Sequence, residues 1–214
     1  TAYEDLLEEQ LQFFSSDHSY FSEYKAATIS RLAPLSGGRL LDFGAGVGLM
    51  IPHFKKYFPN TEICATDVSS ESLNLLHDRF PDVTVFADKE IDSQKFNIIS
   101  IATVMHHVAP AERLDLLKRL EKLLLPGGCV CIFEHNPYNP VTRHMVNTCP
   151  FDKDAILLSM KESKKLLTAS GNMKIRHCGY TLFFPNSMAP LRRLESWLEW
   201  LPLGGQYYVL ASSK

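Results

Sequence analysis

The stretch that decides the fold is Asp42-Phe43-Gly44-Ala45-Gly46-Val47-Gly48, which directly follows the apolar pair Leu40-Leu41. This pattern predicts a short buried strand that carries an acidic residue near its end and opens into a glycine-rich turn. Such a turn brings backbone N–H groups close to a nucleotide-like ligand. We therefore expect an α/β fold with a ligand site behind this strand.

Two features separate the turn from the dinucleotide-binding pattern G-x-G-x-x-G. The third glycine of that pattern would fall at position 49, which is Leu49, whereas the third glycine here is Gly48. In addition, Asp42 precedes Gly44 by two residues, and a carboxylate there repels a pyrophosphate but attracts a cation. The residues thus favour a positively charged ligand, and the sulfonium and amino groups of S-adenosylmethionine meet this requirement.

The composition indicates one domain without a nucleic-acid partner. The chain has 214 residues, is 45% hydrophobic and has a formal net charge of −2, which is enough apolar material for one sizeable core. We expect a single domain over residues 1–214. The lysines and arginines are scattered, so no basic surface for nucleic acid is predicted.

The cysteines point to a reducing compartment. There are five of them, an odd number, and none forms a C-x-x-C pair. Most lie in apolar segments, which is typical of reduced thiols used as small core residues. We therefore predict a cytoplasmic protein. No apolar run approaches the roughly 20 residues of a spanning helix, so integral membrane association is not expected.

Short apolar runs alternate with amphipathic stretches along most of the chain, which predicts a parallel sheet covered by helices on both faces. Pro126-Gly127-Gly128 is expected to end the helix before it and to turn the chain into the next strand. The expected strands are 39–43, 62–66, 83–86, 96–101, 129–133, 174–184 and 206–211, and the expected helices are 50–57, 70–80, 111–124, 161–169 and 189–200.

Two segments fall outside this alternation. Residues 1–35 predict an N-terminal helical lid, because aromatic side chains recur along two helical stretches. Residues 135–158 are rich in Asn, Pro, Thr and Arg and are too long for an ordinary loop, which makes them a substrate-side insertion by length alone. A passive surface excursion is the alternative for this insertion.

The order of these elements, together with Asp42-x-Gly44-x-Gly46-x-Gly48, resembles the class I S-adenosylmethionine-dependent methyltransferases from about Arg39 to Phe133. The resemblance implies a Rossmann-like, doubly wound sheet of seven mostly parallel strands, the last antiparallel. It also implies roles for individual residues. The methionine end of S-adenosylmethionine would lie on Asp42, Gly44, Ala45 and Gly46. Its ribose hydroxyls would bind Asp67, and its adenine amino group would bind Asp88. Val68 would flank the adenine, and Ile101 or Ala102 would flank the methionine moiety.

The acidic residues support this resemblance on physical grounds. Asp67 closes the second expected strand and Asp88 follows the third. The carboxyl ends of strands in such sheets face the ligand crevice, and a carboxylate can accept from two adjacent hydroxyl groups. Asp67 would suit the ribose of NAD equally well, so only the combination of three carboxylates after three strands is specific.

Candidate catalytic side chains follow the fourth and fifth strands. His106-His107 come after the fourth strand, and Glu134-His135 after the fifth. A neutral imidazole near pH 7 can remove a proton from a methyl acceptor. We expect His107 or His135 to be this base, and Glu134 to orient it and raise its basicity. Packing or turn formation is the alternative role for each.

The remaining site predictions concern the acceptor and metals. Residues expected to line the substrate pocket are His106, Tyr20, Tyr24, Asn136, Tyr138 and Arg143. The histidines and Cys149 lack the i, i+4 or C-x-x-C spacings typical of metal sites, so no metal is expected. The apolar helix that contains Trp197 and Trp200 predicts a core or dimer face, with attachment to a membrane surface as the alternative.

Together these features predict a methyltransferase that moves a methyl group from S-adenosylmethionine to the oxygen, nitrogen or carbon of a small molecule, as a monomer or homodimer. Two alternatives stay open. One is an NAD-type Rossmann oxidoreductase, which Leu49 and Asp42 disfavour. The other is a noncatalytic protein that binds S-adenosylmethionine as a sensor or partner.

Overall fold

The computed structural model describes residues 19–149, 152–184 and 186–213. Residue contacts divide the chain into two compact units, residues 1–99 and 100–214, and each unit is described by itself. The single domain expected over residues 1–214 stays a prediction, as does the N-terminal lid, because residues 1–18 lie outside the described part.

The strands form a seven-stranded sheet with the order β3-β2-β1-β4-β5-β7-β6, and β7 runs antiparallel to both of its neighbours. This confirms the predicted Rossmann-like α/β fold. The strands are β1 (Arg39–Phe43), β2 (Glu62–Asp67), β3 (Thr84–Ala87), β4 (Phe96–Ala102), β5 (Leu124–His135), β6 (Met173–Thr181) and β7 (Gln206–Ser213).

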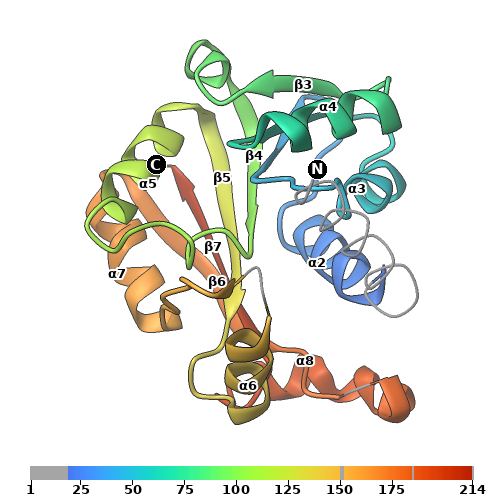
Figure 1. Cartoon of the computed structure of the whole chain (residues 1–214), viewed down its shortest axis with the longest axis vertical. Helices are drawn as coiled ribbons and strands as arrows, with labels where there is room; N and C mark the ends of the chain where they lie inside the picture. Colours follow the sequence, from blue (N-terminus) through green and yellow to red (C-terminus); the bar gives the residue numbers. More distant parts are fainter. Residues whose placement is uncertain (1–18, 150–151, 185, 214) are drawn as a thin grey trace. The chain divides into compact units, whose positions relative to one another are not determined.

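In the first unit, β1 pairs in parallel with β2, and β2 with β3. Its helices are α2 (Ser19–Leu32), α3 (Ile51–Tyr57) and α4 (Ser70–Arg79), followed by a short 3₁₀ helix, η1 (Glu90–Ser93). Helix α4 begins after Ser69, whose hydroxyl accepts from the Ser72 N–H at 3.2 Å and so satisfies a free donor. Figure 1 shows α2 beside α3, in contact with it. Leu40, Leu41 and Phe54 are fully buried and belong to the core of this unit.

In the second unit, α5 (Arg113–Lys122) and α7 (Met160–Ser170) lie side by side in contact (Figure 1). Helix α7 begins with a capping box, in which Ser159 and Glu162 satisfy each other's backbone N–H groups. The other elements are α6 (Pro140–Thr148), the 3₁₀ segment η3 (Asn186–Leu194) and the single-turn helix α8 (Glu195–Leu198).

The predicted irregular insertion contains a helix, α6, that the sequence analysis did not anticipate. The Asn139 side chain accepts from the Thr142 N–H at 2.9 Å, and Pro140 occupies the first helical position. Asn as the N-terminal cap followed by Pro is a standard helix start. The signal was therefore present but was interpreted as a turn.

Two other boundaries differ from the prediction. Strand β5 begins at Leu124 and includes Pro126-Gly127-Gly128, while α5 already ends at Lys122. The helix expected over 189–200 is mostly 3₁₀ and contains Pro190. Glu195, 1% exposed, accepts from the N–H groups of Phe183 and Phe184. This carboxylate accepts from backbone donors of the preceding loop, and the irregular segment itself has a kink at Met188.

Gly48 should tolerate alanine much less well than Gly46. At Gly48 (φ +80°) an added Cβ would lie 2.5 Å from a Phe80 ring carbon and 2.8 Å from a Leu76 methyl, whereas at Gly46 (φ +53°) nothing lies within 4 Å. We expect Gly48→Ala to lower the free energy of unfolding by about 3 kcal/mol, and Gly46→Ala by about 1 kcal/mol. Urea unfolding of the two variants measures the difference, and equal losses would contradict this packing account.

Candidate functional site

In the first unit, the glycine loop after β1 is tied to the end of β2. The N–H groups of Gly44 and Ala45 both donate to the carbonyl oxygen of Thr66, at 2.9 and 3.0 Å. The Gly46 N–H donates to Oδ2 of Asp67 at 2.8 Å. These three donors were expected to face the ligand, and they are engaged within the protein instead. Open space remains beside Gly46, where a ligand can approach the backbone.

Asp42 is the most unusual group of this loop region. Its side chain is 2% exposed, and its Oδ2 atom is buried without a hydrogen-bond partner. Burial raises the pKa of Asp42 to about 7; Lys25 opposes this shift and the nearby charge of Asp67 adds to it. A buried carboxylate with an unused acceptor gains from any cation brought against it. This property matches the cationic ligand expected from the sequence.

The other predicted cofactor contacts of this unit follow β2 and β3. Asp67 also accepts from the Ser69 N–H at 3.0 Å, and since a carboxylate offers about four acceptor sites, about two remain for hydroxyl groups. Val68 is 87% exposed, which suits a flat apolar contact. Asp88 lies just beyond β3 and is partly exposed.

Ile101 and Ala102 belong to the second unit, at the end of β4. Ile101 is fully buried, and Ala102 is partly exposed. Of these two predicted cofactor contacts, Ala102 is thus the one with accessible surface.

In the second unit, Glu134 connects the ends of β4 and β5. It is fully buried; its Oε1 accepts from the Met105 N–H at 2.7 Å, and its Oε2 lies 2.6 Å from Nδ1 of His106. The carboxylate was expected to orient His107 or His135, and this hydrogen bond goes instead to His106. Burial would raise the pKa of Glu134, but the hydrogen bond and charge of His106 outweigh it, so the net shift is downward.

Asp152 completes a compact group with the two adjacent histidines. Its Oδ1 lies 3.3 Å from Nε2 of His106 and 3.5 Å from Nε2 of His107. The ring centroid of His106 lies 4.1 Å from that of His107 and 5.2 Å from that of His135. The fold therefore gathers three histidines and two carboxylates, and we call them the histidine cluster: His106, His107, Glu134, His135 and Asp152.

The two adjacent histidines differ in charge. Burial would lower the pKa of His106, but Asp152 and Glu134 raise it to about 9, so this ring is cationic at neutral pH. Burial and the charge of His106 lower the pKa of His107, whose side chain is 45% exposed. A cationic ring cannot accept a proton, whereas a neutral and accessible one can. His106 thus does not act as a base, and its charge instead lowers the pKa of His107 and of Glu134.

Two of the predicted substrate contacts are buried and make hydrogen bonds within the protein. His106 is 1% exposed and bonded to Glu134, as described above. Asn136 is fully buried; its amide donates to the carbonyl oxygens of Pro202 and Gly204, and its side-chain oxygen accepts from the Tyr138 N–H. Both side chains therefore make hydrogen bonds within the protein, and their expected contact with an acceptor stays a prediction.

The other predicted substrate contacts are accessible. Tyr138 is 64% exposed, and Arg143 is exposed on α6. Tyr20 and Tyr24 are partly exposed on α2 in the first unit, with ring centroids 6.1 Å apart. Each of these four side chains thus has surface that a ligand could contact within its own unit.

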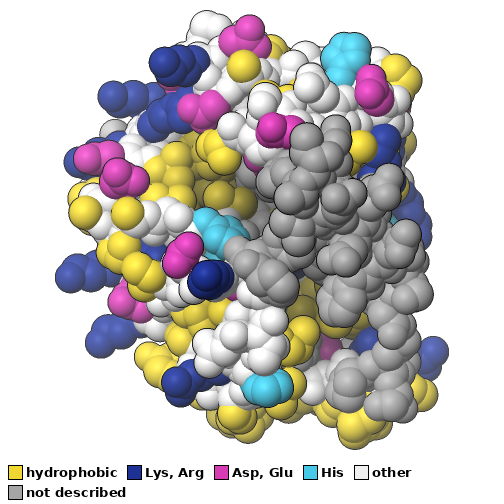
Figure 2. Space-filling model, in the orientation of Figure 1, with side chains coloured by type: hydrophobic (Ala, Val, Ile, Leu, Met, Phe, Trp, Pro, Cys, Tyr) yellow, Lys and Arg dark blue, Asp and Glu magenta, His cyan; other side chains and the backbone are white. Residues whose placement is uncertain are grey.

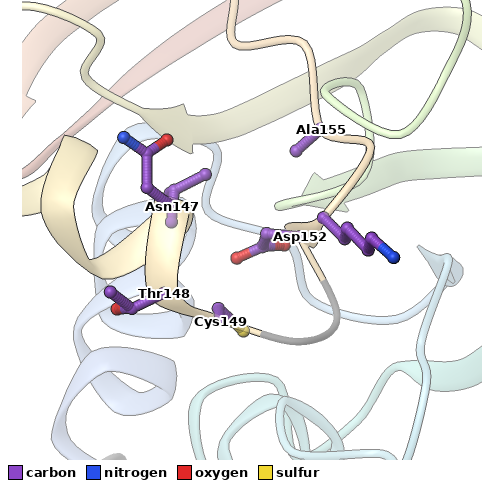
Figure 3. Close-up of a pocket in the computed structure, with 7 residues that line it drawn as sticks. Asn147, Thr148, Cys149, Asp152 and Ala155 are labelled. Atoms are coloured by element: carbon purple, nitrogen blue, oxygen red, sulfur yellow. The ribbon is translucent and has the colours of Figure 1, made fainter.

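A cavity of about 340 Å³ opens beside the histidine cluster (Figure 3). Asp152 forms one wall, and Figure 3 shows Asn147 and Cys149 across from it. Burial would raise the pKa of Asp152, but the contact with His106 and its charge lower it, and the charge of His135 and the thiol of Cys149 add to that lowering. The full lining is Val146, Asn147, Thr148, Cys149, Asp152, Lys153 and Ala155. Polar side chains from the predicted insertion therefore meet the histidine cluster at Asp152.

Asp152 and Lys25 are the functional candidates that the sequence analysis missed. Asp152 lies 46 positions from His106 along the chain, and no spacing rule connects the two. Lys25 lies within a helix in which the aromatic residues form the recognisable sequence pattern and a single lysine does not. Only the folded chain shows that Lys25 acts electrostatically on Asp42.

Hydrophobic side chains gather on the surface of the second unit. They lie at the lower end of the face in Figure 2, where Figure 1 places α6 and α8. The most exposed large hydrophobic side chains of this unit are Trp197, Trp200, Val141, Tyr138 and Leu203. The tryptophans were expected in a core or dimer face, and their 78% and 75% exposure excludes the core of this unit. Among the described residues, no helix has both the length and the apolarity to cross a membrane.

Comparison with known families supports the interpretation of the glycine loop. Residues 41–130 match the model of a methyltransferase domain. This range begins within β1 and contains Asp42, Asp67 and Asp88. No curated protein matches the sequence significantly.

Solved structures share the fold at low sequence identity. A SAM-dependent methyltransferase of Thermotoga maritima, described as a possible histamine N-methyltransferase, has a TM-score of 0.71 and 18% identity, with 99% of this chain and 98% of that chain covered. The plantazolicin methyltransferase BamL, solved in complex with a triazolic desmethylPZN analogue and SAH, has a TM-score of 0.67 and 15% identity, with 98% of this chain and 90% of that chain covered.

A SAM-dependent methyltransferase of Archaeoglobus fulgidus has a TM-score of 0.63 and 16% identity, with 90% of this chain and 94% of that chain covered. At these identities the likeness shows the fold. The domain match over residues 41–130 supports the resemblance found in the sequence: this part of the chain matches a methyltransferase domain, and the solved structures that share the fold are SAM-dependent methyltransferases.

Proposed function

We propose that the protein transfers the methyl group of S-adenosylmethionine to a small-molecule acceptor. The observation that carries this proposal is Asp42, a buried carboxylate with an unpartnered oxygen beside a glycine loop, inside the range that matches the methyltransferase domain. S-adenosylmethionine is the cofactor of this class. Its sulfonium and ammonium groups supply the positive charge that Asp42 lacks.

The reaction is an in-line displacement at carbon. The acceptor atom forms a bond to the methyl carbon while the bond from that carbon to sulfur breaks, and S-adenosylhomocysteine leaves as the neutral sulfide. The protein must hold the two reacting atoms in line and exclude water. Oxygen, nitrogen and carbon acceptors fit this chemistry, and a neutral hydroxyl also needs a base.

We assign the base to His107 or His135. His107 is half-exposed and its pKa is lowered, so its ring is uncharged at neutral pH. His135 is partly exposed beside His106. Glu134 acts indirectly, because it fixes the turn that carries His106 and His107 through the Met105 N–H. Tyr138 and Arg143 are the accessible side chains of this unit that we propose for acceptor binding, and Tyr20 and Tyr24 those of the first.

Charge and thiol chemistry favour a small metabolite in a reducing compartment. The net charge of −2 gives no attraction for nucleic acid. None of the five cysteines is in a disulfide, and burial raises the pKa of Cys64 to about 12 and that of Cys129 to about 11, so these two thiols are unreactive. On this basis we propose a cytoplasmic location. A monomer or a homodimer remains the expected assembly.

Asp67→Ala should weaken cofactor binding. Removing the carboxylate takes away the proposed ribose contacts and the acceptor of the Gly46 N–H, so we expect at least about a tenfold loss of S-adenosylmethionine affinity. Isothermal titration of S-adenosylmethionine and S-adenosylhomocysteine measures it, with Asp78→Ala on the surface of α4 as control and thermal unfolding as a test of folding. Binding of NAD in place of both ligands would refute the proposal.

The affinity for S-adenosylmethionine should rise with pH up to about 7 and then level off. The pKa of Asp42 is raised to about 7, so its carboxyl group is protonated at lower pH and loses its attraction for a cation. Well below this pKa the affinity should fall about tenfold per pH unit. Titrations across this range test the sign, and Asp42→Asn should abolish the dependence. A pH-independent affinity in the unmodified protein would contradict the role of Asp42.

Replacement of the base should reduce turnover rather than cofactor affinity. For a hydroxyl acceptor we expect His107→Gln or His135→Gln to lower kcat by about 10²–10⁴-fold, with S-adenosylmethionine binding unchanged. Transfer of a labelled methyl group to a metabolite library gives the acceptor and then the rate. His177→Gln, on the exposed face of β6, is the matched control. Full activity in both cluster variants would show that the acceptor needs no base from this cluster.

A further inference from the structure

Three potential ligand atoms converge within the histidine cluster. His106, His107 and Asp152 each offer one such atom, and the three atoms lie within 4.8 Å of one another. Oδ1 of Asp152 lies 3.3 Å from Nε2 of His106 and 3.5 Å from Nε2 of His107. Two imidazoles and one carboxylate on a common centre are a frequent donor set for transition-metal ions.

The contact between His106 and Asp152 is an ion pair whose atoms are not aligned for a hydrogen bond. Nε2 of His106 is buried without a hydrogen-bond partner, although Oδ1 of Asp152 lies 3.3 Å away. A charge-assisted N–H···O bond would be about 2.7–2.9 Å long and directed along the N–H. Two potential metal-ligand atoms that lie close together without hydrogen-bond alignment are instead arranged like two ligands of one shared ion.

The spacing also distinguishes between coordination geometries. In a tetrahedral zinc site with bonds of 2.0–2.1 Å, adjacent ligand atoms lie about 3.3–3.4 Å apart. In an octahedral site with bonds of that length they lie about 2.9 Å apart. The observed 3.3 and 3.5 Å agree with the tetrahedral arrangement.

Glu134 supplies the outer support that metal-bound histidines require. Its Oε2 lies 2.6 Å from Nδ1 of His106 and accepts a hydrogen bond from the N–H of that nitrogen. An ion that binds at Nε2 releases the proton of Nε2 and takes its lone pair. A carboxylate on the distal nitrogen fixes the tautomer and orientation of a metal-bound histidine. The Met105 N–H holds the same carboxylate in place.

From this convergence we infer that His106, His107 and Asp152 form a binding site for a divalent transition-metal ion of the zinc type. Three protein ligands leave the fourth tetrahedral position open, as in catalytic zinc sites. Asp152 also lines the adjacent cavity, so a molecule held there lies beside the ion.

The effect of this metal site on catalysis rests on the proposed function. The existence of the metal site does not. With an ion bound, the Nε2 lone pair of His107 is coordinated and cannot take a proton. His135 is then the remaining histidine for the acceptor proton. An acceptor hydroxyl or thiol at the open position would become more acidic on the ion, which reduces the demand on the base.

Metal titration of the full chain tests the site. Protein treated with a chelator and dialysed is titrated with Zn²⁺ against a chromogenic competitor, and the visible spectrum of its Co²⁺ complex reports the geometry. We expect one ion per chain, a tetrahedral cobalt spectrum, and affinities at least about 100-fold weaker in His107→Ala and Asp152→Ala. His177→Ala, an exposed histidine of the same unit, should bind as the unmodified protein does. Glu134→Gln should retain the ligands and lose about 10–100-fold in affinity.

Further outcomes separate this site from a site of adventitious binding. Zinc should raise the Tm of the unmodified protein and not that of Asp152→Ala, which also shows whether the variant folds. The inference is overturned if Zn²⁺ does not bind at micromolar concentration, if His107→Ala and Asp152→Ala bind as tightly as the unmodified protein, or if His177→Ala loses as much. Titration of S-adenosylmethionine into the chelated protein decides the proposed function independently of these results.

Discussion

A buried carboxylate with two partners organises the end of the second unit that carries the histidine cluster. Glu134 is fully enclosed, and its two oxygens bind the Met105 N–H and the Nδ1 of His106. Burying such a charge without partners would cost several kcal/mol, so the turn after β4 must supply both contacts for the chain to fold this way. The orientation of His106, the place of His107 beside it and the approach of Asp152 all depend on that requirement.

In the first unit, the buried carboxylate of Asp42 lacks the full set of partners that Glu134 has. Asp42 is as enclosed as Glu134, yet one of its oxygens has no hydrogen-bond partner and its pKa is raised rather than lowered. The difference follows from the surroundings, because Glu134 has a cationic ring at 2.6 Å, whereas Lys25 does not outweigh the burial of Asp42. A cationic ligand would provide for Asp42 what His106 provides for Glu134. The stored electrostatic cost therefore favours binding of a cation at that position.

The sequence predicted the sheet and the glycine loop after β1 well because both depend on local patterns, whereas the cofactor contacts assigned to that loop stay predictions. Strand β1 matches its expected bounds, and Asp42 and the glycines were identified by their order alone. Helix α6 was missed because Asn139-Pro140 is a signal for both a turn and a helix start. The partner of Glu134 and the position of Asp152 could not be predicted, since they result from tertiary packing between segments that lie 28 and 46 positions apart from His106.

The position of Asp152 is fixed by the same turn that carries the histidines. The Ile156 N–H donates to the carbonyl oxygen of His106 at 2.8 Å, and the Arg113 side chain, which holds the carbonyl of Val108, also binds the carbonyl of Ile156. The insertion is thus attached to both ends of the histidine turn. Any displacement of residues 152–156 would withdraw the carboxylate from His106, lower the pKa of that ring and change the charge beside His107. The segment that lines the cavity therefore controls the electrostatics of the histidine cluster as well as its shape.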